Sequence, residues 1–428
     1  MSLPLASFIN HTPFAAQYYL GEDQHRQTFH VAALRITYDM ANTPEGEALW
    51  FADEQTPLSE TDEYYGELNQ SSVRWESDFV PYKPKCDVLI VNASAHAPQG
   101  RAAARWAVRV LITAPHPPAE LPPPPQGLNH RMQPSKECIA EWEKQVKRIQ
   151  EQAATPLTVL YKTLQVTGPR QWKKGLFGGW TLSQPEPALS VPMQYEYAYG
   201  GENKWFTDRQ NAATDTPAIW ESEQCNTVGR GFAAPAWLKA AQPDNIPAPQ
   251  IEDPDEPVRE FGKAYAPQGF GAVTRAWLPR RTLAGTYDAA WKAERWPHLP
   301  EDFDFAYWNG AHPDMQVPHL AGNETIVLHN LCPTDYLPHL ETGELGQILR
   351  CRLPGHRPYI LIRLNQGALV PKPLPIDTLI VDMAAKKIIT VHHACIPLDA
   401  DVRVLEACMT PAQEVQRQEA IRLAQRRA

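Results

Sequence analysis

Apolar and polar residues alternate along several short stretches of the chain, which is the pattern of a β-strand with one buried face. In residues 34–39, Leu34, Ile36 and Tyr38 fall on one face and polar side chains fall on the other. The same alternation marks four further segments, at residues 105–112, 158–166, 347–353 and 359–364. The pattern therefore predicts a mainly β protein built from sandwich-like antiparallel sheets.

Turn signals connect some of these predicted strands. Pro354-Gly355 is a turn sequence between segments 347–353 and 359–364. Residues 377–394 resemble a hairpin whose turn lies near Ala384–Lys386. The chain also has 42 prolines among 428 residues, about twice the usual share. Because proline is excluded from helix interiors and central strands, we expect long Pro-rich loops.

Residues 114–157 interrupt the β pattern and look inserted between two neighbouring strands. The first part, residues 114–127, is rich in proline and predicts extended polyproline-like chain. A helix is predicted after it, with Ser135 as N-cap and Glu137 in the first turn. One helix face carries an apolar stripe of Ile139, Trp142, Val146, Ile149 and Ala153. Packing of this stripe on the protein's own sheet is the favoured interpretation, and a tethered docking helix anchored by Trp142 is the alternative.

The C-terminal part of the chain predicts a second β region that ends in a helix. Thr410 and Gln413 fit a capping box, and Pro411 suits the first helical position, so we expect a helix over residues 410–427. We divide the chain into a main β domain, 1–320, which includes the 114–157 insertion, and a C-terminal region, 321–428.

Composition narrows the class of partner and the compartment. A net charge of −9 without a long basic run argues against nucleic acid binding. Neither a signal peptide nor an apolar run of about 18 residues is present, so we expect no membrane partner and a cytoplasmic location. Seven scattered cysteines without a CxxC pair indicate free thiols and no metal site.

A search for catalytic patterns finds no established motif, and no cofactor is expected. The Gly-rich string at 175–180 lacks the strand–glycine–helix context of a nucleotide loop and is interpreted as a turn. Asp302 and Asp304 would share one face of an extended segment and could hold a cation or serve in acid–base chemistry. Hydrogen bonding to loop amides is the favoured role for such residues. Together with Glu196, they define one alternative function, that of a carbohydrate-active hydrolase.

Charged residues of both signs crowd the stretch 73–87. Arg74 lies near Glu76 and Asp78 in the sequence, and two lysines precede Asp87. Closely mixed charges between strands more often pair and hold a loop than perform catalysis. We interpret this stretch as scaffold.

Several uncommon strings occur in a characteristic order: NHTPF, EYYG, SSVRWESDFVPYKPKCDVLIVNASAHAP, VPMQYEYAYGG, NTVGRGF, and PQGFGAVTRAWLPRRTLAGTYDAAWKAERWPHLPEDFDFAYWNGAHPDMQ. Together they resemble the domain-of-unknown-function 2169 family, from about Asn10 to Gln316 and more weakly beyond Gly322. The chain departs from the family pattern at Cys86 and Thr227, and residues 114–157 look like an insertion.

The resemblance implies an accessory protein of bacterial type VI secretion systems. Such an adaptor would bind an effector, often of the PAAR or Rhs type, and promote its loading onto a VgrG-type spike without covalent chemistry. Aromatic and arginine residues are enriched at interfaces, so the candidate contact residues are Trp142, Ile149, Arg230, Arg275 and Trp277. A structural component of the baseplate or spike is a second alternative. The sequence leaves open which effector is bound, which surface binds it, and the oligomeric state.

Overall fold

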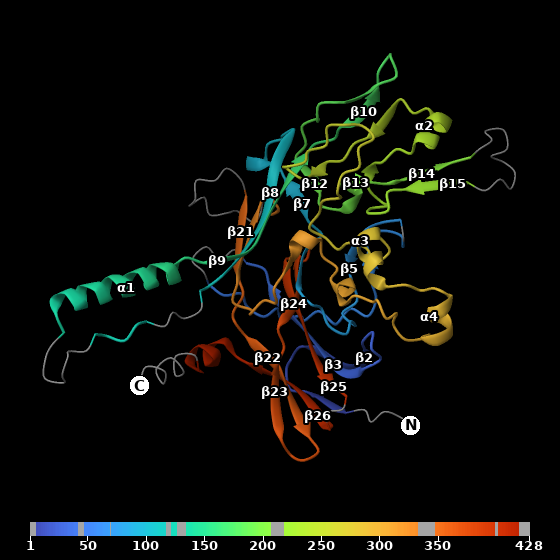
Figure 1. Ribbon diagram of the computed structural model, residues 1–428. Coiled ribbons are helices and arrows are strands. Elements are labelled where there is room, and N and C mark those ends of the chain that lie inside the picture. The colour runs from blue at the N-terminus through green and yellow to red at the C-terminus, as the bar shows by residue number, and fades with distance from the viewer. Residues whose placement is uncertain are drawn as a thin grey trace.

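The protein is mainly β, as the alternation predicts (Figure 1). The computed structural model describes residues 6–41, 47–68, 70–116, 121–125, 134–206, 218–332, 347–398 and 401–418. Within these ranges, three large sheets share one continuous apolar core, and smaller sheets and short helices pack around them.

A six-stranded sheet lies at the centre of the fold, in the order β19-β6-β24-β25-β3-β2. All neighbouring pairs are antiparallel except β6 and β24, which are parallel. β24 and β25 form the hairpin that the sequence predicts at 377–394. The bounds are β2 Ala15–Glu22, β3 Thr28–Asp39, β6 Cys86–Val91, β19 Gln316–Val317, β24 Ile376–Asp382 and β25 Lys387–Pro397.

A five-stranded antiparallel sheet runs in the order β18-β9-β8-β20-β21. On β8, every second side chain from Trp106 to Ile112 is buried and the residues between them are more exposed, as predicted. β8 and β9 are direct neighbours, and the first and last residues of the predicted insertion 114–157 lie opposite each other at the ends of these two strands. The bounds are β8 Arg105–Ala114, β9 Leu157–Thr167, β18 Ile251–Glu252, β20 Thr325–His329 and β21 Ile348–Arg352.

A four-stranded sheet completes the core in the order β1-β26-β22-β23, with β1 and β26 parallel. β21 and β22 flank the predicted turn at Pro354-Gly355 but belong to different sheets, so this turn passes the chain from one sheet to the next. The bounds are β1 Ser7–Asn10, β22 Arg357–Leu364, β23 Leu369–Pro373 and β26 Val402–Thr410.

The remaining short strands form small sheets next to the three large ones. One group forms the three-stranded sheet β11-β10-β17, and the others form two-stranded pairs. The bounds are β4 Glu63–Tyr64, β5 Val73–Trp75, β7 Ser94–His96, β10 Gln171–Lys174, β11 Trp180–Leu182, β12 Ser190–Pro192, β13 Tyr199–Gly200, β14 Glu202–Trp205, β15 Ile219–Ser222, β16 Arg230–Gly231 and β17 Asn245–Pro247.

Within the described residues, helices are short except for α1. The bounds are α1 Lys136–Ala154, α2 Pro235–Ala241, α3 Leu278–Arg281 and α4 Ala289–Glu294, with 3₁₀ turns η1 Pro98–Gly100, η2 Tyr195–Tyr197, η3 Thr282–Ala284, η4 Phe305–Trp308 and η5 Pro313–Met315. Residues 412–418 begin the predicted C-terminal helix, and 419–427 lie outside the described residues.

Strand β3 shows where one-dimensional alternation falls short. Its apolar face is buried, as predicted, but Arg35 and Thr37 on the other face are only 1% and 0% exposed. Asp78 pairs with Arg35, and Gln55 bonds the backbone of Thr37, so a loop-rich layer covers this face. β3 is therefore buried on both sides. Strands from both sides of the predicted boundary at residue 320 also share all three large sheets.

Candidate partner-binding site

The mixed-charge stretch 73–87 is built around the buried carboxylate of Asp87. This side chain is 0% exposed. Its oxygens accept hydrogen bonds from the Lys83 ammonium at 2.8 Å, the Asn309 amide at 3.0 Å, and the backbone N–H groups of Gly310 and Ala311 at 2.8 and 3.1 Å. Burial lowers the pKa of Lys83, but nearby carboxylates outweigh burial and hold that pKa above its ordinary value. Asp87 therefore ties strand β6 to the 309–311 loop.

A second buried pair joins Glu76 to Arg280 on α3. The Arg280 guanidinium donates to Glu76, to the Val273 carbonyl at 2.7 Å and to the Tyr307 carbonyl at 2.7 Å. Burial raises the pKa of Glu76, but the guanidinium groups of Arg280 and Arg275 outweigh burial, and the pKa lies below its ordinary value. Both partners remain charged and hold α3 against the stretch.

Asp78 completes the pattern. Its carboxylate accepts from Arg35 at 2.6 Å and from the Ser59 N–H at 2.8 Å. The acidic groups of 73–87 thus carry close basic or amide partners, which supports the interpretation of this stretch as scaffold.

Two adjacent histidines on β25 lie in the same buried layer. As an extended strand requires, they have different partners. The His392 ring bonds the Leu374 carbonyl at 3.0 Å, whereas His393 bonds the Asp377 carboxylate at 2.6 Å. Burial lowers the pKa of His392 to about 4. Burial also acts to lower the pKa of His393, but Asp377 outweighs it and raises that pKa.

Asp302 and Asp304 both accept hydrogen bonds from backbone N–H groups. Asp302 accepts from the Thr286 N–H at 2.9 Å and from the Thr286 hydroxyl at 2.7 Å. Asp304 caps η4 by accepting the Ala306 N–H at 2.8 Å. These are the backbone-amide roles that the sequence favours for the two acids.

Glu196 has the same kind of role. Its carboxylate accepts from both the N–H and the hydroxyl of Ser72, at 2.8 and 2.7 Å. Within the described residues, no group of three or more His, Cys, Asp or Glu side chains is arranged to hold a metal ion. Likewise, no helix in those ranges combines the length and apolarity needed to cross a bilayer.

Helix α1 begins as the sequence predicts. The Ser135 side chain accepts the Cys138 N–H at 3.2 Å, and Glu137 lies in the first turn. Lys147 pairs with Glu151 at 3.8 Å. Every described helix side chain is exposed except four, which are half-buried and form the apolar stripe: Ile139, Trp142, Val146 and Ile149.

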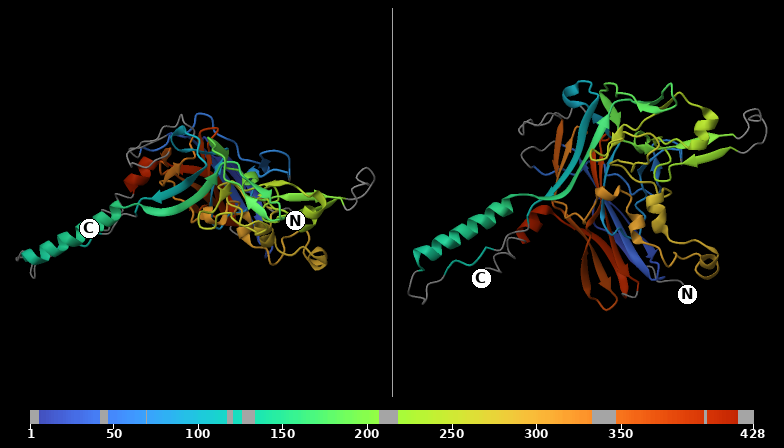
Figure 2. Two further views of the ribbon diagram at one scale, coloured as in Figure 1. Left: turned by 90° about the horizontal axis from the view of Figure 1, so that it is seen from above. Right: turned by 45° about the horizontal axis from the view of Figure 1, so that its top comes forward.

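The favoured expectation that this stripe packs on the protein's own sheet is wrong. α1 extends away from the three sheets in every view (Figures 1 and 2). The Trp142 indole N–H donates to the Pro122 carbonyl at 2.9 Å, so the neighbour of the stripe is the Pro-rich segment 121–125. We call residues 121–125 and α1 together the arm. Each side chain of the stripe remains only half-buried, so the arm presents apolar surface outside the core.

Arg230 is the first residue of β16, and its side chain is engaged within the fold. Its Nε donates to the Glu196 carbonyl at 2.7 Å, and one terminal nitrogen donates to the Gln250 side chain at 3.0 Å. The guanidinium carbon lies 4.1 Å from the centre of the Tyr197 ring. This arginine is half-buried and engaged within its own chain.

Arg275 and Trp277 are also engaged internally. Arg275 lies 3.4 Å from both Asp62 and Glu76 and sits over a tryptophan ring. Trp277 is 3% exposed and packs edge-on against Tyr195, with ring centres 5.2 Å apart. Burial corrects the assignment of Trp277 as a surface contact.

The five candidate residues therefore separate into two groups. Trp142 and Ile149 lie on the arm, whereas Arg230, Arg275 and Trp277 lie in the body, and α3, which follows Trp277, is on the other side of the molecule from α1 (Figure 1). The structure does not bring them together into one site. Sequence reasoning missed the role of Arg280, whose partner Glu76 is 204 positions away.

The chain was compared with known families, curated proteins and solved structures. No curated protein and no solved structure matches it. One family matches residues 25–116 and 137–393, and its description is "Uncharacterized protein conserved in bacteria (DUF2169)". The unmatched gap covers 117–136, so the Pro-rich segment is outside the match while α1 is almost entirely within it, and the likeness continues well past Gly322. The chain belongs to the DUF2169 family of bacterial proteins.

Proposed function

We propose that this protein is a cytoplasmic adaptor that binds a type VI secretion effector, of the PAAR or Rhs type, and promotes its loading onto a VgrG-type spike. The observation that carries the proposal is the arm. An amphipathic helix normally buries its apolar face against its own domain, whereas α1 presents its stripe outside the core. Helix-in-groove recognition uses apolar side chains spaced in this way.

The inner charge pairs hold parts of the fold together, and the proposal does not draw on them. Three buried carboxylates accept hydrogen bonds that hold loops in place, those of Asp87, Glu76 and Asp78. The acids considered for hydrolysis, Asp302, Asp304 and Glu196, accept backbone N–H groups. The residues on which the hydrolase alternative was based make these hydrogen bonds, and we do not propose that activity.

The arm can be removed cleanly. Ala114 at the end of β8 pairs directly with Leu157 at the start of β9. Residues 115–156 can therefore be replaced by Asn-Gly, which closes a two-residue hairpin turn. In the native host, tagged wild-type protein should recover one toxin together with a spike protein. The armless variant should lose the toxin while keeping the wild-type circular dichroism spectrum.

Matched substitutions sharpen this test. Trp142→Ala/Ile149→Ala alters the stripe, whereas Lys144→Ala/Arg148→Ala alters exposed positions on the same helix. Loss of toxin recovery only in the first pair would support docking through the stripe. Normal loading by the armless variant would show that the arm is not the docking element. Absence of toxin and spike from an abundant, folded wild-type sample would contradict the adaptor itself, and stable stoichiometric presence in the assembled machine would favour a structural component.

A further inference from the structure

The hairpin of β10 and β11 carries two apolar side chains into solvent. Leu176 and Phe177 are 101% and 102% exposed, as in an extended peptide. They occupy the turn of a hairpin that projects from the end of the molecule (Figure 1). Single exposed apolar residues are common on proteins, but two adjacent ones at the end of a projection mark a contact surface. We call residues 175–179 the tip.

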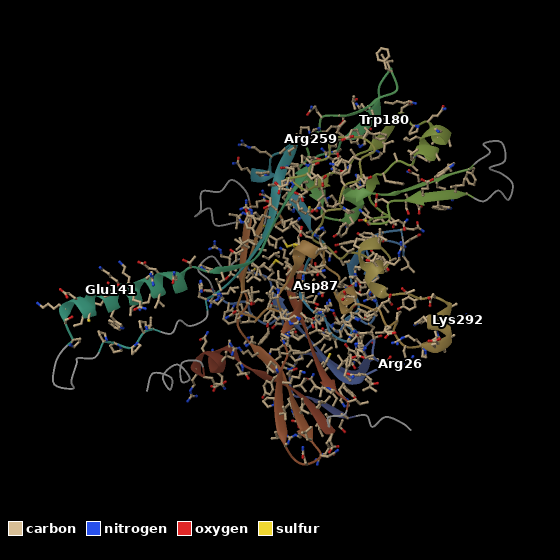
Figure 3. All side chains as sticks on the ribbon, viewed as in Figure 1. Arg26, Asp87, Glu141, Trp180, Arg259 and Lys292 are labelled. Atoms are coloured by element: carbon tan, nitrogen blue, oxygen red, sulfur yellow. The ribbon has the colours of Figure 1, made fainter. Side chains whose placement is uncertain are left out.

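Backbone hydrogen bonds and an aromatic stack hold the turn that forms the tip. The Gly175 N–H donates to the Gly179 carbonyl at 2.7 Å, and the Gly178 N–H donates back to Gly175 at 3.0 Å. Below the turn, Trp180 stacks on Phe261 with ring centres 4.6 Å apart. Trp180, labelled in Figure 3, lies near the end of this projection. β17 pairs with the other edge of β10. The turn that carries the two apolar side chains is therefore held by its own backbone hydrogen bonds and by the packing of Trp180 below it.

Two basic residues directly precede the tip in the chain. Lys173 and Lys174 are exposed, and residues 171–182 contain no Asp or Glu. On a chain with net charge −9, this is a local positive site. Asp244, whose carbonyl accepts the Lys174 N–H at 3.0 Å, is exposed beside it and reduces that charge in part.

We propose that the tip docks on the surface of a lipid bilayer that contains anionic lipids. Leu176 and Phe177 enter the acyl boundary, Trp180 lies at the headgroup level, and the two lysines contact lipid phosphates. A convex apolar end with basic flanks fits a planar anionic surface, and a plane can approach it because the hairpin projects from the body (Figure 1). The expectation of no membrane partner rested on the absence of a spanning segment, which does not bear on surface docking. This inference does not depend on the adaptor function.

The test uses the purified full-length chain and vesicle flotation. Vesicles of phosphatidylcholine alone are compared with vesicles of phosphatidylcholine and phosphatidylglycerol at a 3:1 ratio. The wild type should bind the anionic vesicles more strongly, and 0.5 M NaCl should weaken that binding because salt screens exposed charges. Leu176→Ser/Phe177→Ser should lower the partition coefficient at least tenfold. Lys173→Glu/Lys174→Glu should abolish the preference for anionic vesicles.

A matched control is available on another hairpin. Ile219 and Trp220 on β15 are 37% and 54% exposed, and Ile219→Ser/Trp220→Ser should leave vesicle binding unchanged. Equal flotation of wild type and tip variant, or no flotation of the wild type, would overturn the proposal. If the wild type ignores vesicles while the tip variant alone loses a protein partner, the tip is a protein contact and the membrane proposal is wrong.

Discussion

The mixed-charge stretch 73–87 and the arm are both rich in features that suggest function, yet the structure uses them in opposite ways. In the stretch, carboxylates such as Asp87 are buried and satisfied by several donors. On the arm, four apolar side chains are half-buried beside a proline-rich segment, outside the core. The difference teaches that dense chemistry in a sequence can serve stability, whereas a sparse apolar stripe can lie outside the core.

The largest expected loss of stability comes from a substitution in the mixed-charge stretch 73–87. Asp87→Ala removes the acceptor for Lys83 and three other donors, and leaves a buried ammonium without its closest carboxylate. We expect the free energy of unfolding to fall by about 3–5 kcal/mol, measured by urea denaturation. Asp255→Ala, at an exposed position, is the control. A loss no larger than that of the control would mean that Asp87 does not hold the loops together.

The free energy of unfolding should change by about 3 kcal/mol with pH through His392. The reason is that the pKa of this residue in the folded protein, about 4, lies well below its ordinary value of 6.5. Between pH 6.5 and 4 the unfolded state binds more protons at this residue. Its contribution is therefore complete above pH 6.5 and is lost as the pH falls toward 4. Urea denaturation of His392→Gln across this range should show a shallower dependence than the wild type.

The neighbouring His393 acts with the opposite sign. Because Asp377 raises the pKa of His393, its contribution is complete below pH 6.5 and is lost as the pH rises through the folded pKa. The difference between wild type and His392→Gln isolates the first effect from the second. Parallel pH profiles for the two proteins would contradict the assigned pKa of His392.

A smaller loss is expected from Gly310→Ala. A Cβ atom at this position would lie 2.3 Å from one oxygen of the Glu76 carboxylate, whose other oxygen accepts from Arg280. Moving this buried pair should lower the free energy of unfolding by about 1–3 kcal/mol. Gly179→Ala has open space around the added atom and should change little. Similar urea midpoints for the two variants would show that the pair relaxes at no cost.

A substitution on the arm should have the smallest effect on the free energy of unfolding. Trp142→Ala should alter the free energy of unfolding by no more than about 0.5 kcal/mol, because this side chain lies outside the core. Toxin recovery should nevertheless fall. If Trp142→Ala instead destabilises the protein as strongly as Gly310→Ala, the contrast between a stabilising stretch and a binding arm is incorrect.

Local patterns predicted much of the secondary structure. The alternation in 105–112, the Ser135 cap and the 377–394 hairpin all appear where the sequence indicates them, because each depends on residues close together in the chain. The parts that could not be predicted depend on distant partners. Glu76 and Arg280 are far apart in sequence, and a loop layer that no local pattern reveals covers the second face of β3.

The arm and the candidate contact residues show a second limit. An amphipathic stripe has the same sequence whether it packs on its own sheet or projects, so the position of Trp142 could not be decided in advance. Composition likewise could not distinguish a buried tryptophan such as Trp277 from an exposed one. The exposed pair Leu176 and Phe177 was recognisable only as part of a turn.

The position of the β24–β25 hairpin has a consequence for how the chain matures. These strands, residues 376–397, lie between β6 and β3, which are made hundreds of residues earlier. During synthesis, both early strands emerge with unpaired edges that can recruit other strands. The central sheet is complete only when the late hairpin inserts between β6 and β3. The native core therefore forms late in translation, after most of the chain has been synthesised.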